Sequence, residues 1–172
     1  MTGEHYLIDT ELGDFSIWLD VKNAPETCGY FSQLFKQGEF EGSSIFRIVN
    51  AENAEMRTTT PIEVVQLGSP HMSAIADPKF AHEHSSVTGL RHKQWTISAA
   101  RGEVGENYPS LFICMRDEPE LDHGGGRHPD GQGFAAFGKV ESGFETVQAI
   151  YAKAEDGEFL ENPIAIASVV TC

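Results

Sequence analysis

Short apolar segments of strand length recur along the whole chain, whereas only two segments carry apolar residues at helical spacing. Most of the strand-like segments follow one another without a helix between them. Consecutive strands pair most simply as antiparallel neighbours, and closing such a sheet on itself removes its exposed edges. The predicted fold class is therefore all-β dominated: an eight-stranded antiparallel closed β-barrel capped by two α-helices. A β-sandwich is the alternative architecture.

The predicted strands have alternating or continuous apolar patterns and are bounded by turn residues. In chain order, strands are predicted at residues 5–9, 15–20, 43–50, 61–67, 95–100, 111–115, 133–140 and 164–171. A glycine-bearing turn at residues 11–14 predicts a hairpin between the first two strands. Residues 68–94 and 117–132 lack periodicity and are predicted to be long loops.

Both helices are predicted from apolar spacing together with end signals. In the first, Asn23 is expected to cap the N-terminus and Pro25 lies in the first turn, with Gly38 after the end. The second is expected to begin at a capping box formed by Ser142 and Glu145. Each helix has a single apolar stripe, so we expect both to cover openings of the barrel.

Composition narrows the classes of protein to which the chain can belong. Its 172 residues can bury a core without disulfides, and a single domain over residues 1–172 is expected. The formal net charge of −14 disfavours nucleic acid and anionic membranes as partners. Cys28, Cys114 and Cys172 lack paired spacing, which predicts reduced thiols in a cytoplasmic protein. A secretory signal removed from the mature chain is the open alternative.

The strand at residues 43–50 places one guanidinium among large apolar side chains. Strand alternation predicts that Arg47 shares a face with Ile45 and Val49. Phe46 and Ile48 should then face the opposite way. Both faces are apolar, which predicts that one covers the core and the other floors a groove containing the arginine. From this pattern alone, an edge-strand arginine with its head in water is the open alternative.

The remaining polar motifs are weak indicators of a site. His82 and His84 are two residues apart, and His123 and His128 flank a glycine run, but neither pair has zinc spacing. The acidic run at residues 117–122 lacks the ligand pattern of a calcium loop. No Gly-x-Ser-x-Gly elbow accompanies the glycine run. The sequence therefore predicts neither a metal nor a cofactor, and regulation by a metal at the histidine loops is the weaker alternative.

Five short segments stand in a fixed order along the chain. They are Phe46-Arg47, Val65-Gln66, Ile97-Ser98-Ala99-Ala100-Arg101, Leu111-Phe112-Ile113-Cys114 and Phe137-Gly138-Lys139-Val140. The series resembles the cyclophilins, the peptidyl-prolyl cis-trans isomerase family, and most of all their bacterial members. One segment alone would be weak evidence, whereas the whole series in order is specific. The resemblance runs from the first hairpin to Val170, and it implies an eight-stranded barrel capped by two helices.

Carried over residue by residue, the resemblance also implies a site. Arg47 would be the catalytic arginine, Gln66 the glutamine beside it, and Phe112 the floor of the pocket that takes the proline ring. The other implied substrate-binding residues are Val64, Ala100, Ser110, Leu121 and Phe134. No cofactor or metal is implied.

At the rim of the implied pocket, the chain departs from the family pattern. Ser110 stands where a glutamine is usual, and Glu120 where an aromatic residue is usual. Phe134 occupies the site of a histidine or tyrosine, and Arg101 that of a backbone-binding asparagine. The connections around residues 51–61 and 123–133 are longer than in typical members. We therefore expect an altered sequence preference, and weak or no binding of cyclosporin.

The implied function is acceleration of rotation about X–Pro peptide bonds in unfolded or flexible polypeptides, with Arg47 stabilising the twisted amide. The alternative is a catalytically weak cyclophilin-like module that holds proline-containing segments in a chaperone or scaffold role. Proline-containing polypeptides are the expected partners, without nucleic acid or membrane, and a monomer is expected.

Overall fold

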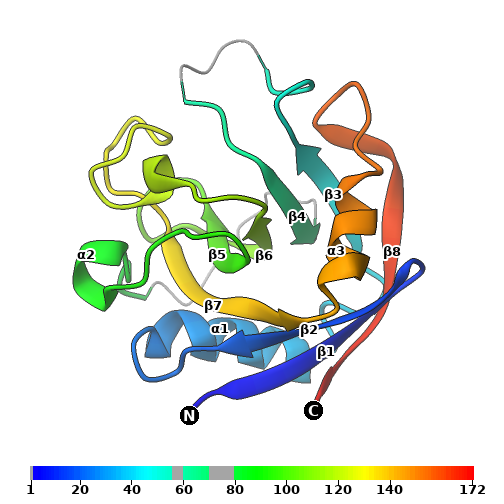
Figure 1. Cartoon of the computed structure of the whole chain (residues 1–172). Coiled ribbons are helices and arrows are strands. Elements are labelled where there is room, and N and C mark those ends of the chain that lie inside the picture. Colours follow the sequence, from blue (N-terminus) through cyan, green and yellow to red (C-terminus); the bar gives the residue numbers. More distant parts are fainter. Residues whose placement is uncertain (1, 56–59, 70–79) are drawn as a thin grey trace.

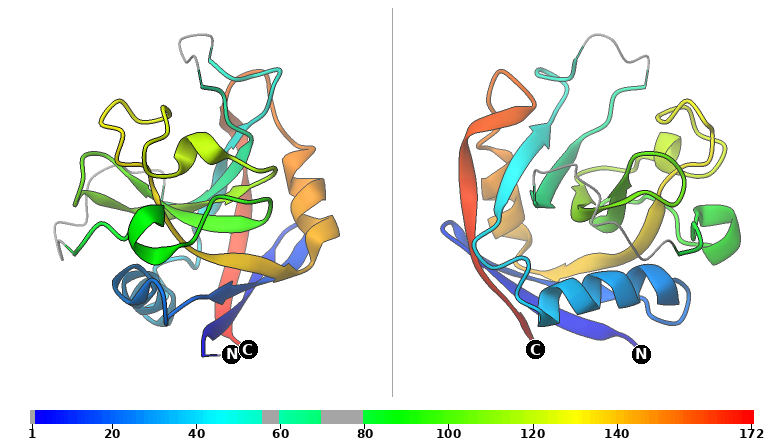
Figure 2. Two further views of the ribbon diagram at one scale, coloured as in Figure 1. Left: turned by 60° about the vertical axis from the view of Figure 1, so that its left-hand side comes forward. Right: turned by 180° about the vertical axis from the view of Figure 1, so that it is seen from behind.

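The computed structural model describes residues 2–55, 60–69 and 80–172. Eight strands form a closed barrel in the order β1-β2-β7-β5-β6-β4-β3-β8 (Figure 1). They are β1 (Glu4–Thr10), β2 (Gly13–Leu19), β3 (Ser44–Val49), β4 (Val64–Gly68), β5 (Thr96–Arg101), β6 (Asn107–Cys114), β7 (Ala135–Ser142) and β8 (Phe159–Thr171). Every neighbouring pair is antiparallel, so the predicted fold class is confirmed. Pairing of β1 with β8 brings both termini to one end of the barrel (Figure 2).

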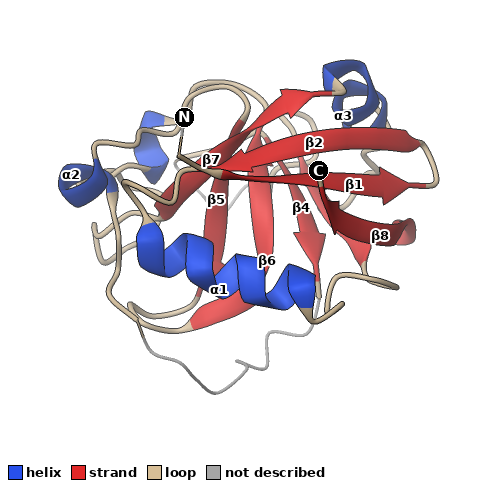
Figure 3. Cartoon of the chain, turned by 90° about the horizontal axis from the view of Figure 1, so that it is seen from below, coloured by secondary structure: helices blue, strands red, loops and turns tan. Residues whose placement is uncertain are grey.

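The two predicted helices are α1 (Pro25–Lys36) and α3 (Phe144–Tyr151). Helix α1 lies across one end of the barrel (Figure 3), and α3 packs against β2 and β4. The segments predicted as loops also contain the four-residue helix α2 (Ser85–Thr88) and the 3-10 turn η1 (Pro119–Leu121). Residues 70–79 of the first predicted loop lie outside the described residues. Among the described helices, none has the length and hydropathy needed to cross a membrane.

The predicted cap of α1 is wrong. Ala24 occupies the cap position, and the side chain of Asn23 donates instead to the Asp20 carboxylate at 2.8 Å. The carboxylate of Glu83 accepts hydrogen bonds from the backbone N–H and the hydroxyl of Thr27, both at 2.6 Å. A carboxylate at a helix N-terminus satisfies a backbone donor and favours the helix dipole. It comes from a residue 56 positions away in the chain, so no local pattern could reveal it.

The predicted capping box of α3 is also wrong. Gly143 occupies the cap position with a φ of 75°, in the left-handed region that glycine adopts without strain. A Cβ atom at this position would lie 2.6 Å from the backbone of Asp14 and Phe15, which no ordinary contact allows. The hydroxyl of Ser142 is hydrogen bonded to that of Ser16 in the neighbouring strand at 2.6 Å. Tertiary packing rather than local capping therefore fixes this helix start.

The barrel has apolar side chains on both faces of several strands. The interior core includes Ile8, Ile17, Val65 and Ile113, all fully buried, and helix α1 adds Phe31. A second, smaller cluster lies on the other face of β3, β4 and β6. Its members are Val49, Ile62, Val64, Ala100, Phe112, Cys114 and Leu121. Strands buried on both faces agree with the near-continuous apolar runs in the sequence, and the second cluster provides the floor of a groove.

Candidate active site

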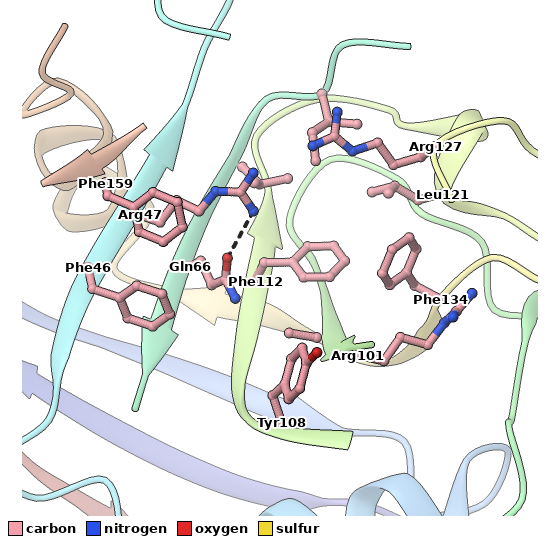
Figure 4. A pocket seen from close by; sticks show the side chains of 13 residues that line it. Phe46, Arg47, Gln66, Arg101, Tyr108, Phe112, Leu121, Arg127, Phe134 and Phe159 are labelled. Atoms are coloured by element: carbon pink, nitrogen blue, oxygen red, sulfur yellow. Dashed lines mark hydrogen bonds between the residues drawn. The ribbon is translucent and has the colours of Figure 1, made fainter. Parts of the chain in front are cut away.

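A pocket of about 270 Å³ opens over this second cluster (Figure 4). Seven residues that the resemblance assigns to the site line it: Arg47, Val64, Gln66, Ala100, Phe112, Leu121 and Phe134. The other lining residues are Phe46, Ile62, Arg101, Tyr108, Arg127 and Phe159. Ser110, in contrast, is buried behind Gln66 and does not line the pocket; its hydroxyl accepts a hydrogen bond from the Gln66 amide at 3.2 Å.

A β-bulge in β3 brings Arg47 to the pocket. The pairing of β3 with both of its neighbours shifts register between Ile45 and Arg47. Ile45 and Ile48 therefore enter the interior core, while Phe46 and Arg47 both line the outer pocket. The prediction that Arg47 and Val49 share a face is confirmed. The prediction is wrong for Ile45, which enters the core, and for Phe46, which lies on the same face as Arg47. A bulge adds one residue to a strand and breaks the strict alternation on which that prediction depended.

Three of the five N–H groups of Arg47 are held by other side chains. Its Nε and Nη2 atoms donate to Oε2 of Glu158 at 3.1 and 2.6 Å, and its Nη1 donates to Oε1 of Gln66 at 3.2 Å. A guanidinium carries five N–H groups in a fixed plane. Within the described chain, the two remaining N–H groups have no assigned acceptor, and the guanidinium borders the pocket (Figure 4). The arginine is thus fixed in orientation and still has donors for a ligand.

Glu158 is the partner that sequence reasoning missed. Its side chain is only 5% exposed, and its second oxygen accepts the backbone N–H of Glu55 at 3.1 Å. Burial by itself would raise the pKa of this carboxyl, but the hydrogen bonds from Arg47 and Glu55 hold the pKa below its usual value. The group is therefore ionised at neutral pH. Glu158 lies 111 residues from Arg47, and no motif around it indicates a site.

The opposite side of the pocket is apolar. We call Phe112, Leu121 and Phe134 the proline wall, after the role that the sequence resemblance implies for this pocket. The rings of Phe112 and Phe134 meet edge to face with centroids 5.7 Å apart. Such a corner between two aromatic rings and an aliphatic side chain suits a compact apolar ring.

A buried polar network supports the proline wall from behind. The imidazole of His92 lies parallel to the ring of Phe112, with centroids 6.3 Å apart. Its Nδ1 is hydrogen bonded to Asp122 and its Nε2 to Ser98, both at 2.8 Å. The His92 side chain is fully buried, and the backbone N–H of the same residue also donates to Asp122. These bonds hold the His92 ring in place behind Phe112. They also hold Asp122, which directly follows Leu121, so two members of the proline wall are restrained from behind.

Arg101 lines the same pocket, yet all five of its N–H groups are used within the protein. Nε and Nη2 donate to the carbonyl of Gly133 at 2.9 and 2.7 Å, and Nη1 donates to the carbonyl of Gly102 at 2.8 Å. The two Nη atoms also donate to the two carboxylate oxygens of Asp130, each at 3.0 Å. Its guanidinium carbon lies 4.9 Å from the centroid of Phe134. Arg101 therefore clamps the segment that follows Leu121 and has no donor left for a ligand.

Arg127 lies in the inserted segment, and Glu120 precedes that segment in η1. Arg127 is half-buried at the pocket, where burial and the positive charge of Arg47 lower the pKa of its guanidinium. Its Nη1 donates to the carbonyl of Thr60 at 3.3 Å. The carboxylate of Glu120 accepts the backbone N–H of Gly126 at 2.7 Å and does not line the pocket. The residue at the expected aromatic position thus stabilises the inserted loop.

The histidine loops come together in space. The rings of His84 and His123 stack with centroids 4.1 Å apart, and the centroids of His82 and His84 are 5.4 Å apart. Among the described residues, no three or more histidine, cysteine or carboxylate side chains form a group that could hold a metal ion. The metal alternative therefore has no ligand set in this part of the chain.

In a comparison with protein-family models, residues 5–171 match the family described as cyclophilin type peptidyl-prolyl cis-trans isomerase. The chain is 29% identical over 168 residues to peptidyl-prolyl cis-trans isomerase-like 1 of Aspergillus fumigatus, covering 95% of this chain and 94% of that protein. It is 30% identical to the protein of the same name from Emericella nidulans, covering 94% and 92%. It is 29% identical to peptidyl-prolyl cis-trans isomerase A of Dickeya dadantii, covering 87% and 72%.

Structure comparison gives the same fold. A cyclophilin type peptidyl-prolyl cis-trans isomerase of Cryptosporidium parvum superposes with a TM-score of 0.76 at 20% identity, covering 99% of this chain and 98% of the other. A second structure of that protein, solved in the presence of the dipeptide Ala-Pro, gives a TM-score of 0.75, again at 20% identity, covering 98% and 99%.

Proposed function

The chain belongs to the family of cyclophilin-type peptidyl-prolyl cis-trans isomerases, and we propose that its Arg47 speeds isomerisation of X–Pro bonds by stabilising the twisted amide. The observation that most supports the proposal is how the N–H groups of this guanidinium are used. Three of them donate to Glu158 and Gln66, which leaves two for a ligand in the apolar-walled pocket that Arg47 lines. The proposed substrates are proline-containing polypeptides, and the proposed domain extent is the whole chain.

The chemistry requires no covalent intermediate. Resonance makes rotation about a peptide bond cost about 18–20 kcal/mol, and X–Pro bonds populate both isomers but exchange slowly. In the twisted amide, resonance is lost and the prolyl nitrogen regains its lone pair. A donor that binds this lone pair interacts more strongly with the transition state than with either planar isomer, which is the condition for catalysis.

Arg47 has the features of such a donor. Its orientation is fixed before substrate arrives, so little reorganisation is needed at the moment of rotation. Gln66 receives one hydrogen bond from Arg47 and gives one to Ser110, which holds its own amide in place. The proline wall would hold the ring still while the preceding residue turns. Each component is built from side chains that other parts of the barrel already restrain.

The test is exchange between the two isomers of a proline peptide, measured by NMR with wild type and with Arg47→Ala. Removing one preorganised donor typically costs about a hundredfold to a thousandfold in rate, so we expect catalysed exchange to fall by that order. Lys93→Ala is the control for loss of a positive charge, because this lysine is 65% exposed, pairs with the exposed Asp117 and does not line the pocket. Equal exchange in wild type and Arg47→Ala would refute the proposal.

A further inference from the structure

A second apolar surface lies across Arg47 from the proline wall. Phe46 and Phe159 stack with ring centroids 6.4 Å apart and an interplanar angle of 19°. Both line the same pocket as Phe112, and Figure 4 shows them on the other side of Arg47. We call this pair the aromatic ledge.

Phe159 is the exposed member of the ledge. Its surface is 59% exposed, whereas that of Phe46 is 6% exposed. Among the described residues, Phe144 is the next most exposed phenylalanine, at 36%. Isolated exposed apolar side chains are common on protein surfaces, so exposure alone does not define a site. Phe159 differs because its ring is stacked on a buried ring and borders the pocket that contains Arg47.

The spacing places the ledge within reach of residues close to the proline. The guanidinium carbon of Arg47 lies 5.4 Å from the centroid of Phe159. An extended chain advances about 3.3–3.6 Å per residue. With the prolyl nitrogen at Arg47, a side chain one or two residues away in the sequence therefore reaches the ledge.

We propose that the aromatic ledge is a second binding subsite, which takes an aromatic or large aliphatic side chain one or two residues from the proline. The inference rests on the proposed function, because the proline must occupy the wall for the flanking residue to reach the ledge. Phe159 supplies apolar area and a ring face, and aromatic pairs gain stability beyond simple area burial. Phe46 stacks on Phe159, and both rings line the same pocket as the proline wall.

The experiment compares peptides that differ only within two residues of the proline, where they carry Phe, Leu or Ala. The measured quantity is the ratio of kcat/KM for the Phe peptide to kcat/KM for the Ala peptide. We expect Phe159→Ala to lower this ratio by about threefold to tenfold, as loss of one aromatic contact predicts. Phe159→Leu should retain part of the ratio, because it keeps apolar area. Phe144→Ala removes an exposed phenylalanine outside the pocket and should leave the ratio unchanged.

The ratio of kcat/KM values distinguishes a direct contact between the ledge and the flanking residue from an indirect effect through Arg47, which also contacts Phe159. A uniform loss across all peptides would mean that Phe159 acts only through the arginine, and it would overturn the subsite. An unchanged ratio in Phe159→Ala would also overturn it, while leaving the proposed isomerase intact. Absence of catalysed exchange in wild type would instead refute the proposed function. In that case the ledge would be tested by NMR titration with the same peptides. We would then expect Phe159→Ala to reduce the preference in affinity for the Phe peptide over the Ala peptide by the same factor.

Discussion

Of the three arginines in the described chain that border the pocket, Arg47 and Arg101 differ in how many hydrogen-bond donors they retain for a ligand. All five N–H groups of Arg101 donate to Asp130 and two backbone carbonyls, whereas three N–H groups of Arg47 donate to Glu158 and Gln66. The side chain of Arg101 is 2% exposed and that of Arg47 is 20% exposed. Both have a carboxylate partner, so the presence of an ion pair does not distinguish them. The comparison indicates that Arg101 stabilises the fold and that Arg47 is available for chemistry.

The largest difference should be in stability. Arg101→Ala removes five hydrogen bonds from a side chain that is 2% exposed, including those to the carbonyls of Gly133 and Gly102. Leaving a buried polar group unsatisfied costs about 1–3 kcal/mol, so we expect a loss of about 3 kcal/mol in the free energy of unfolding, measured with urea. Arg47→Ala should cost less, because it removes three side-chain hydrogen bonds rather than five. The buried carboxylate of Glu158 that it leaves keeps the Glu55 N–H and can take up a proton. Equal losses in the two variants would remove the distinction between them.

The next effect concerns the carboxylate that holds Arg47. Glu158→Ala leaves the guanidinium held by Gln66 alone, and we expect the exchange rate at saturating peptide to fall about tenfold, since a hydrogen bond to a charged group contributes about 1.5–3 kcal/mol. Glu158→Gln retains an acceptor of the same shape and should recover most of the rate. Peptide affinity should change little in either variant. A loss of affinity at constant rate would show that Glu158 acts on binding and not on the orientation of Arg47.

The smallest expected effect is on the pH dependence of the free energy of unfolding, to which the Arg101–Asp130 ion pair contributes. Hydrogen bonds from Arg101 lower the pKa of Asp130 to about 2, well below the usual value of an aspartate. A lowered pKa in the folded state means that the pair contributes stability above about pH 4 and loses it as the pH falls towards 2. Asp130→Asn should therefore narrow the difference in stability between pH 6 and pH 2.5, measured by urea unfolding. An identical pH dependence in wild type and variant would contradict this role.

Local patterns predicted the barrel, because apolar alternation and turn residues act over a few positions. They failed where distant groups decide the structure. The local sequence favours Asn23 as the cap of α1, but the Glu83 carboxylate from another segment accepts a backbone N–H at the start of this helix. Alternation placed Phe46 on the wrong face of β3, because the bulge depends on how β3 pairs with β4 and β8.

The candidate site shows the same division. The resemblance assigned Arg47, Gln66 and the proline wall, all of which line one pocket in the structure. It could not assign Glu158 or Phe159, because their roles depend on contacts across more than a hundred residues of sequence. It also could not show that Arg101 has no free donor, since that depends on the path of the inserted loop around Asp130.

The most direct measurement is the exchange rate at saturating peptide for Arg47→Ala and Arg47→Lys, with the dissociation constant measured in parallel. Lysine keeps the positive charge but has no planar fork to bind Glu158 and Gln66 together while donating to a substrate. We expect both variants to lose about a hundredfold or more in rate, with dissociation constants close to that of wild type. Exchange near the wild-type rate in Arg47→Lys would show that charge alone suffices, and it would contradict catalysis by an oriented guanidinium.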